Sequence, residues 1–244
     1  MLGFRRFILH RAPRYNEPMR LSIVIPALNE ADNVAATLTP LQAMRSRGVE
    51  VVLVDGGSTD ETRRIAAPLV DRLVEGSKGR ARQMNAGAKL AIGDAIWFLH
   101  ADSLVPQDAD TVILHGLQSA THVWGRFDVS IAGHHYLLPV VGWFMNHRSR
   151  LSGIATGDQG LFMTRAAFLA AGGFANQPLM EDVAICVALK KLGAPLCLRQ
   201  RIVTSGRRWE KHGVWRTIFL MWRLRLAYSL GADPVTLHRA YDGK

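Results

Sequence analysis

Cysteine is scarce in this 244-residue sequence, and long apolar runs are missing from it. The two cysteines, Cys186 and Cys197, form neither a metal-type CxxC pair nor a disulfide framework, so a reducing compartment such as the cytoplasm suits them. No apolar segment reaches the roughly 20 residues that a membrane-spanning helix needs. Internal repeats and low-complexity linkers are also absent. These absences argue against disulfide scaffolds, repeat proteins and membrane-spanning proteins, and favour one globular domain.

Acidic residues are outnumbered by basic ones, and the formal net charge is +10 at pH 7. Such an excess predicts an acidic partner: nucleic acid, anionic lipid or a phosphorylated small molecule. Charge alone does not choose among them. We expect residues 1–19 to form a basic tail, because they lack the long apolar core of a secretory signal, and Met19 is a candidate translation start.

The first half of the chain alternates short β-branched runs with helical patterns. Turn residues end the first two runs, at Pro26 and at Asp55. Ser58 and Glu61 have capping-box spacing, and Pro106 suits the first position of a later helix. This alternation predicts an α/β fold with a parallel sheet. The expected strands are 21–25, 50–54 and 95–99, and the expected helices are 32–45, 58–70, 81–91 and one beginning at 106.

Polar residues follow the expected strands at the edge where such sheets bind ligands. Asn29 and Glu30 follow the first strand, and Asp55 ends the second. In "FLHADS", His100 and Asp102 stand two positions apart, so in an extended chain they face the same side, roughly 7 Å apart. Each alone could be a turn former or a helix cap. Several acids at one sheet edge favour a binding site.

Several segments together resemble family 2 glycosyltransferases of the GT-A fold. The resemblance covers 21 to about 210, so we expect a GT-A domain at 20–210. It implies a Rossmann-like mixed sheet flanked by helices, followed by a C-terminal amphipathic helix. Finer details, "FLHAD", "ATGDQG", "PLMED" and "TSGRRWE", are similar to a bacterial subgroup associated with radical SAM genes and arsenosugar biosynthesis. The segments that carry the family resemblance are "VIPALNEADNV", "VVLVDGGSTDET", "GRARQMNAGAKLAIGDAIWFLHADS", "GDQGLF" and "MEDVAICVALKKLG".

The resemblance implies transfer of a sugar from a nucleotide-diphosphate donor, with UDP the commonest carrier, to an acceptor hydroxyl. "HAD" occupies the place of the family's DxD motif, so Asp102 is the implied ligand of a divalent metal, Mn²⁺ or Mg²⁺. His100 departs from the usual first Asp. Its imidazole either contacts ribose or phosphate, or reaches the metal and favours manganese.

The resemblance also assigns the nucleotide site. Asp55 matches the acid that pairs with the uracil edge, and a carboxylate can accept the imide N–H. Glu30 suits the ribose hydroxyls, and Arg82 matches a basic residue near the base and phosphates, although an exposed helix arginine is an equal alternative. The implied nucleotide-binding residues are Pro26, Asn29, Glu30, Asp55, Gly56, Arg82, His100, Ala101 and Asp102.

The pair "ED" matches the family's catalytic acids. Asp182 is the implied base, which removes the proton of the acceptor hydroxyl during a single inverting displacement. Glu181 is implied to orient the loop or contact the acceptor. Pro178 and Gly193 bracket a helix that would carry both acids in its first turn. Acids are also ordinary at that position, because the helix dipole favours them there.

The acceptor side is expected near "TGDQG" and "SGRRW". Asp158, Gln159, Arg208 and Trp209 are the implied contacts to donor sugar or acceptor, and a simple glycine turn is the alternative for the first segment. Ser205 stands where processive relatives have Gln in their QxxRW signature. We therefore expect non-processive transfer to a small-molecule or lipid-linked acceptor.

Three other functions compete with sugar transfer. A nucleotidyltransferase would normally show a glycine- and lysine-rich phosphate loop after the first strand, and "PALNEAD" is not one. A non-catalytic nucleotide-sugar-binding protein would share the fold. A nucleic-acid-binding protein would leave the strand-end acids electrostatically unfavourable, so we expect no nucleic acid partner.

The segment 213–231 is left unused by the catalytic interpretation. We expect 211–244 to be a helical extension packed on the domain. At 100° per residue, Trp215 and Trp222 share one apolar face, Leu224 and Tyr228 occupy another, and arginines lie between. One face would pack on the core. The other suits either an anionic membrane surface, giving peripheral attachment to the inner leaflet, or a second subunit in a homodimer.

Overall fold

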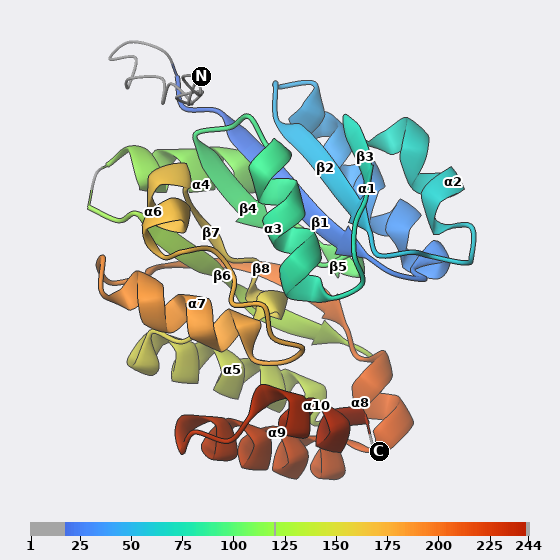
Figure 1. Ribbon diagram of the computed structural model, residues 1–244, viewed down its shortest axis with the longest axis vertical. Coiled ribbons are helices and arrows are strands. Elements are labelled where there is room, and N and C mark those ends of the chain that lie inside the picture. Colours follow the sequence, from blue (N-terminus) through green and yellow to red (C-terminus); the bar gives the residue numbers. More distant parts are fainter. Residues whose placement is uncertain (1–17, 120, 243–244) are drawn as a thin grey trace, which may run out of the picture.

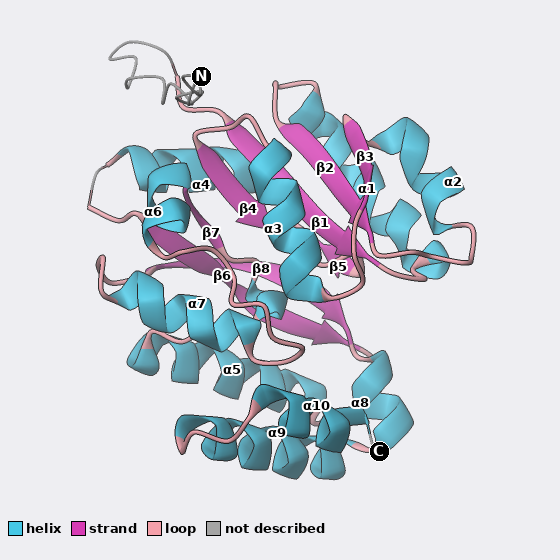
Figure 2. Cartoon of the chain, viewed as in Figure 1, coloured by secondary structure: helices cyan, strands magenta, loops and turns pink. Residues whose placement is uncertain are grey.

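The computed structural model describes residues 18–119 and 121–242, so the expected tail lies almost wholly outside the described residues. It is an α/β fold in which helices flank one curved sheet, as the sequence predicts (Figure 1, Figure 2). The strands are β1 (Leu21–Ala27), β2 (Glu50–Asp55), β3 (Arg72–Glu75), β4 (Ala95–Phe98), β5 (Ser103–Leu104), β6 (Trp124–Ala132), β7 (Phe162–Thr164) and β8 (Leu196–Ser205). The α-helices are α1 (Ala31–Arg45), α2 (Thr62–Ala66), α3 (Arg80–Leu90), α4 (Ala109–Gln118), α5 (Leu138–Ser152), α6 (Arg165–Ala170), α7 (Glu181–Lys190), α8 (Arg207–His212), α9 (Val214–Ser229) and α10 (Pro234–Asp242).

The sheet has the strand order β3-β2-β1-β4-β7-β6-β8-β5. β1 to β4 are mutually parallel, β7 runs antiparallel to both of its neighbours, and β6 and β8 pair in parallel. The strands β1, β4, β6 and β8 therefore end at the same edge. The expected parallel sheet is thus confirmed for the first half and becomes mixed beyond β4.

Both faces of the sheet are buried, which explains the near-continuous apolar runs of its central strands. Ile23 and Ile25 point into one hydrophobic cluster with α1 and α4, whereas Val24 points into a second cluster with α3, α6 and α7. The two helical layers hold the strand ends in fixed register. Cys186 is buried in the second cluster, and both cysteines are free thiols.

The C-terminal helices pack at one end of the molecule, beside α5 and α7 (Figure 1). α5 and α9 share a small cluster that includes Leu138 and Val214. The inner face of α9 packs with α10 through Leu224 and Leu237, and both contact Met180, directly before α7. No helix within 18–119 or 121–242 is long and apolar enough to cross a membrane.

Two helix starts differ from the sequence predictions. α2 begins at Thr62 and continues as a 3₁₀ turn at Ala67–Leu69, and the capping box predicted for Ser58 and Glu61 does not form. The Ser58 hydroxyl instead accepts from the backbone N–H of Asn29. α4 begins at Ala109, three residues after Pro106, so the predicted first position of Pro106 is wrong.

Candidate active site

A cavity of about 770 Å³ opens at the carboxyl ends of β1, β4 and β8. Its wall is completed by the start of α3, the segment before α7, and parts of α8 and α10. The predicted site residues on this wall are Pro26, Glu30, Arg82, His100, Ala101, Asp102, Asp158, Glu181, Arg208 and Trp209. The predicted residues that lie away from it are Asn29, Asp55, Gly56, Gln159 and Asp182.

Arg207 connects the loops after β1 and β4. Its guanidinium lies 3.2 Å from the Glu30 carboxylate and 3.6 Å from that of Asp102. Arg207 is about half exposed, so these ion pairs are screened by solvent and contribute little to stability. They hold the carboxylates of Glu30 and Asp102, both on the cavity wall, beside one guanidinium.

Asp55 is fully buried just beneath the cavity. Its Oδ2 accepts from the backbone N–H groups of Gly57 and Ser58, whereas its Oδ1 has no hydrogen-bond partner in the described structure. A buried carboxylate oxygen without a donor is costly, so this atom suits an N–H group brought by a ligand. The side chain of Gln83 packs against Gly56 and would meet any Cβ there at 3.0 Å.

Asn29 adopts a left-handed conformation, with φ of 53°, and turns away from the cavity. Its Oδ1 accepts from the backbone N–H of Thr59. Together with the bond from its own N–H to Ser58, this ties the loop after β1 to the loop after β2. Asn29 therefore holds the loops after β1 and β2 together in this structure.

His100 is oriented by Asp158. The imidazole Nδ1 lies 3.1 Å from Asp158 Oδ1, and the buried Nε2 faces Gly157, where an added Cβ would come within 2.4 Å of it. Burial opposes ionisation of Asp158, but the His100 hydrogen bond and the positive charges of His100 and Arg80 outweigh it and lower its pKa. The ring thus has one nitrogen bound to Asp158 and the other packed against backbone.

The start of α3 brings positive charge to the opposite wall. Lys78, Arg80 and Arg82 line the cavity there, and the first turn of the helix contains no acid. The exposed N–H groups and the dipole of a helix N-terminus favour anions. Arg82 is positioned by Asn176, whose Oδ1 accepts from its Nε at 2.8 Å. The combination is suited to phosphate oxygens.

Only one acid of the "ED" pair lines the large cavity. Both lie in the first turn of α7, as predicted, after Met180 in a left-handed conformation. Glu181 lines the large cavity, only 3% exposed and 3.4 Å from Arg80. Asp182 lines a small recess of about 10 Å³ behind it, where its carboxylate accepts from the backbone N–H groups of Gly157 and Val183. Burial and the neighbouring Asp182 charge raise the pKa of Glu181.

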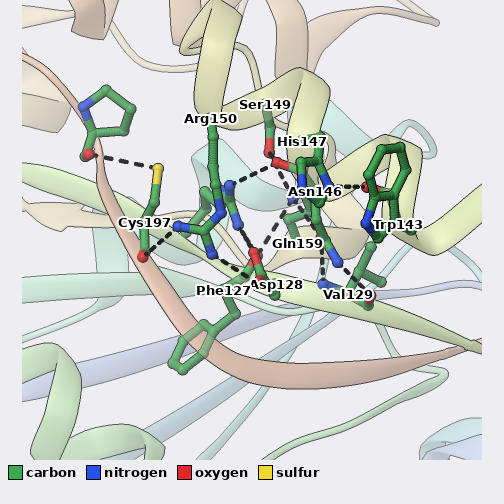
Figure 3. A network of polar contacts seen from close by, with 12 residues as sticks. Phe127, Asp128, Val129, Trp143, Asn146, His147, Ser149, Arg150, Gln159 and Cys197 are labelled. Atoms are coloured by element: carbon green, nitrogen blue, oxygen red, sulfur yellow. Dashed lines mark hydrogen bonds and ion pairs between the residues drawn. The ribbon is translucent and has the colours of Figure 1, made fainter.

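Gln159 was predicted to contact donor sugar or acceptor, and the structure places it elsewhere. Its side chain is fully buried between β6 and α5, where it donates to Ser149 and approaches Asn146 and the Phe127 carbonyl (Figure 3). It also accepts from the backbone N–H of Thr156, which completes a capping box around the turn that carries Asp158. Its role in the structure is to fix that turn, so it cannot touch a sugar in the cavity.

α10 contributes to the cavity in a way that the sequence predictions missed. Val235, His238 and Tyr241 recur every three residues, which places them on one helix face, and that face lines the cavity. The Arg208 guanidinium lies 3.4 Å from the centre of the Tyr241 ring and donates to the Tyr241 carbonyl. The three-residue spacing in the sequence indicates that these side chains share one helix face. It does not indicate what that face packs against.

The carboxylates on the cavity wall are the candidate ligands for a metal ion. Within the part of the chain that the structure describes, no cluster of three or more His, Cys, Asp and Glu side chains is arranged to hold a metal ion. Asp102 nevertheless lines the cavity with a partly exposed carboxylate. Mg²⁺ is commonly bound through one or two carboxylates together with substrate phosphates, and Asp102 fits that mode. His100 fits it less well, because its Nδ1 is bound to Asp158 and its buried Nε2, which has no hydrogen-bond partner among the described residues, faces the backbone of Gly157.

Curated relatives match less than half of the chain. The chain is 43% identical over 98 residues to the PGL/p-HBAD biosynthesis glycosyltransferase of Mycobacterium bovis, covering 37% of this chain and 38% of that protein. It is 28% identical over 116 residues to the poly-beta-1,6-N-acetyl-D-glucosamine synthase of Staphylococcus aureus, covering 43% of this chain and 27% of that one. The matched part is thus less than two fifths of the length of these relatives.

Solved structures share the fold over more of the chain. The mannosyltransferase PcManGT from Pyrobaculum calidifontis, in complex with GDP-Man and Mn²⁺, superposes with a TM-score of 0.63 at 23% identity, over 94% of this chain and 71% of that one. S. aureus TarS in complex with UDP superposes with a TM-score of 0.64 at 16% identity, over 77% and 60%. The fold is therefore the GT-A fold. The family model described as glycosyl transferase family 2 matches residues 22–169, more than half of the chain, and the chain belongs to that family.

Proposed function

We propose that this protein is an inverting, non-processive glycosyltransferase that moves a sugar from a UDP-sugar to an acceptor hydroxyl. The observation that carries the proposal is the composition of one cavity at the sheet edge. Basic residues at the start of α3 face carboxylates from the loops after β1 and β4, Glu181 of α7 lines the same cavity, and Asp182 lies in the recess behind it. A nucleotide-diphosphate sugar needs these groups: cations for phosphates and a carboxylate for the acceptor proton.

The uridine assignment is supported by Asp55. Its partnerless Oδ1 can accept the imide N–H of uracil, which would satisfy a buried oxygen that the protein leaves without a donor. TarS was solved with UDP and with UDP-GlcNAc, whereas PcManGT was solved with GDP-Man, so the fold accepts more than one base. The choice of uridine therefore rests on this one carboxylate.

A divalent metal, Mn²⁺ or Mg²⁺, is proposed to be held by Asp102 together with the donor phosphates. Such a cation would offset the negative charge that develops on the departing diphosphate. Arg207 stands beside Asp102 and can neutralise further phosphate charge. His100 is assigned a different task, which is to hold the turn at Asp158 against the end of β4.

The base is proposed to be Asp182, with Glu181 beside it at the acceptor. Burial and the neighbouring Asp182 charge raise the pKa of Glu181. Asp182 accepts backbone N–H bonds from Gly157 and Val183, which fix the position of its carboxylate. Glu181 is the acid already exposed to the large cavity, so the role of proton acceptor has to be tested at both residues.

The acceptor is proposed to be a small molecule or a lipid-linked sugar. Ser205 at the place of the processive signature's Gln, with Thr204 and Trp209 also on the wall, supports a single transfer. The arsenosugar-associated subgroup remains a prediction from four short motifs.

Calorimetry with UDP, in the presence and absence of Mn²⁺, tests the donor proposal. We expect binding that strengthens with the metal in the wild type and does not in Asp102→Ala. A folded protein that binds no nucleoside diphosphate under either condition would remove the proposal.

A further inference from the structure

The exposed face of α9 is apolar and aromatic. Trp215, Phe219, Trp222 and Leu226 recur at helical spacing, and each is between 58% and 66% exposed. Leu230, directly after the helix, extends the same stripe at 79% exposure. A contiguous apolar stripe of this kind on a protein surface marks an interaction site.

α5 carries a second exposed stripe. Val140, Trp143, Phe144 and Leu151 are exposed along it, with Trp143 packed against the His147 ring at 3.8 Å. The two helices share one hydrophobic cluster and lie side by side (Figure 1). We refer to the two stripes together as the aromatic face.

A basic cavity lies beside the α9 stripe. It measures about 520 Å³, and Arg208, His212, Arg216 and Arg223 line it together with Phe219. Neither this lining nor α9 itself contains an acidic residue. Arg208 and Tyr241 belong to both this cavity and the proposed active-site cavity, so the two cavities are neighbours.

We propose that the aromatic face docks on an anionic lipid bilayer, with lipid phosphates entering the arginine-lined cavity. Tryptophan and arginine are the residues best suited to the interface between lipid headgroups and acyl chains. The arginines match the negative surface, and the net charge of +10 adds to the attraction. This docking does not depend on the donor chemistry proposed above.

A second copy of the chain is a poorer occupant of the same face. A two-fold dimer would place the same patch on both subunits, and Arg216 and Arg223 of each copy would approach those of the other. No acid on α9 could neutralise them. A lipid surface brings the opposite charge instead.

Docking would also affect the turn that leads into α7 and its two acids. The inner face of α9 contacts Leu179 and Met180, the residues that lead into Glu181, and Tyr228 accepts a hydrogen bond from Gln177 in the same segment. A helix held at a membrane would thus hold this turn in place. The proposed active-site cavity would open next to the bilayer.

Vesicle flotation tests the proposal with the full chain. The wild type is expected to float with phosphatidylcholine vesicles that contain phosphatidylglycerol at low salt, less so at high salt, and not with phosphatidylcholine alone. Arg216→Gln/Arg223→Gln should partition ~30-fold more weakly, which corresponds to about 1 kcal/mol per arginine. Phe219→Ser/Trp222→Ser should also lose flotation.

The matched control is Arg63→Gln/Arg64→Gln on α2, which removes the same charge from exposed positions at a distance from α9 (Figure 1). It should float like the wild type. UDP binding and circular dichroism of every variant separate docking from folding and from the donor proposal.

Three results would overturn the proposal: a folded wild type that ignores anionic vesicles at low salt, a control that loses as much flotation as the α9 variants, or α9 variants that float normally. A dimer in sedimentation velocity that Phe219→Ser/Trp222→Ser dissociates would assign the face to a second copy instead.

Discussion

The His100 imidazole Nδ1 lies 3.1 Å from Asp158 Oδ1, which joins the end of β4 to the turn before β7. This bond explains how a histidine can replace an acid two positions before Asp102. The ring is turned toward the protein and stabilises the cavity wall, whereas the Asp102 carboxylate remains on the cavity. The sequence predicted that His100 contacts ribose or phosphate or reaches the metal; its bond to Asp158 adds a positioning role that was not predicted.

Gly157→Ala should disturb this bond, because the added Cβ would lie 2.4 Å from His100 Nε2. Displacing the ring by about 1 Å is expected to lower transfer on the order of 100-fold. A double-mutant cycle with His100→Ala checks the cause, since removing the ring makes space for the methyl group. If Gly157→Ala costs the same in both backgrounds, the clash with His100 is not responsible.

Asp102→Ala should abolish the manganese dependence of UDP binding, whereas His100→Ala should keep it. Asp102 is the carboxylate on the cavity, whereas the His100 Nδ1 is bound to Asp158 and its buried Nε2 faces the backbone of Gly157. Calorimetric titrations with and without Mn²⁺ measure both. If UDP binding by Asp102→Ala depends on Mn²⁺ as strongly as in the wild type, Asp102 does not hold the metal.

Asp182→Asn should bind UDP nearly normally and lose transfer by about 100- to 10,000-fold, the usual scale for loss of a general base. Glu181→Gln should lose less transfer activity than Asp182→Asn, and its main effect should be a higher KM for the acceptor. Steady-state kinetics of the two variants, side by side, rank the acids. A larger loss of kcat in Glu181→Gln would move the role of base to the acid that lines the large cavity.

Glu181→Gln should also stabilise the protein at neutral pH. Burial and Asp182 raise the pKa of Glu181 in the folded protein. Protonated Glu181 therefore stabilises the fold fully at pH values below its pKa in the unfolded chain, and this contribution is lost as the pH rises through its pKa in the folded protein. The neutral amide avoids that loss, so the difference in Tm between the variant and the wild type should grow from acidic to neutral pH. The exposed acid Glu61, changed to Gln, provides a control. A Tm difference that is independent of pH would contradict the assignment.

Local patterns predicted β1, β2 and β4 and the acids at their ends, but not the other five strands that the structure describes. β-branched runs ended by turn residues are local signals, and parallel strands bring their carboxyl ends to one edge, so Glu30, His100 and Asp102 could be placed together in advance. Helix starts were less predictable. Ser58 has the spacing of a cap, but its hydroxyl is taken by the backbone of Asn29, a contact between two loops that spacing alone does not specify.

The remaining site residues depend on tertiary packing. Gln159 lies one residue from Asp158, yet it points into a buried polar network while Asp158 lines the cavity. α10 reaches the cavity because α9 carries it there, and neither Tyr241 nor His238 belongs to a motif. The separation of Glu181 from Asp182 likewise follows from how α7 packs against Gly157.

A donor-hydrolysis screen tests the central claim most directly, because leakage of the sugar to water reveals the donor without knowledge of the acceptor. Sugar nucleotides based on UDP, GDP and other carriers would be incubated with the protein and Mn²⁺, and release of the nucleoside diphosphate measured. We expect hydrolysis of a UDP-sugar by the wild type, and its loss in Asp102→Ala. A folded protein that hydrolyses and binds none of the sugar nucleotides would contradict the account.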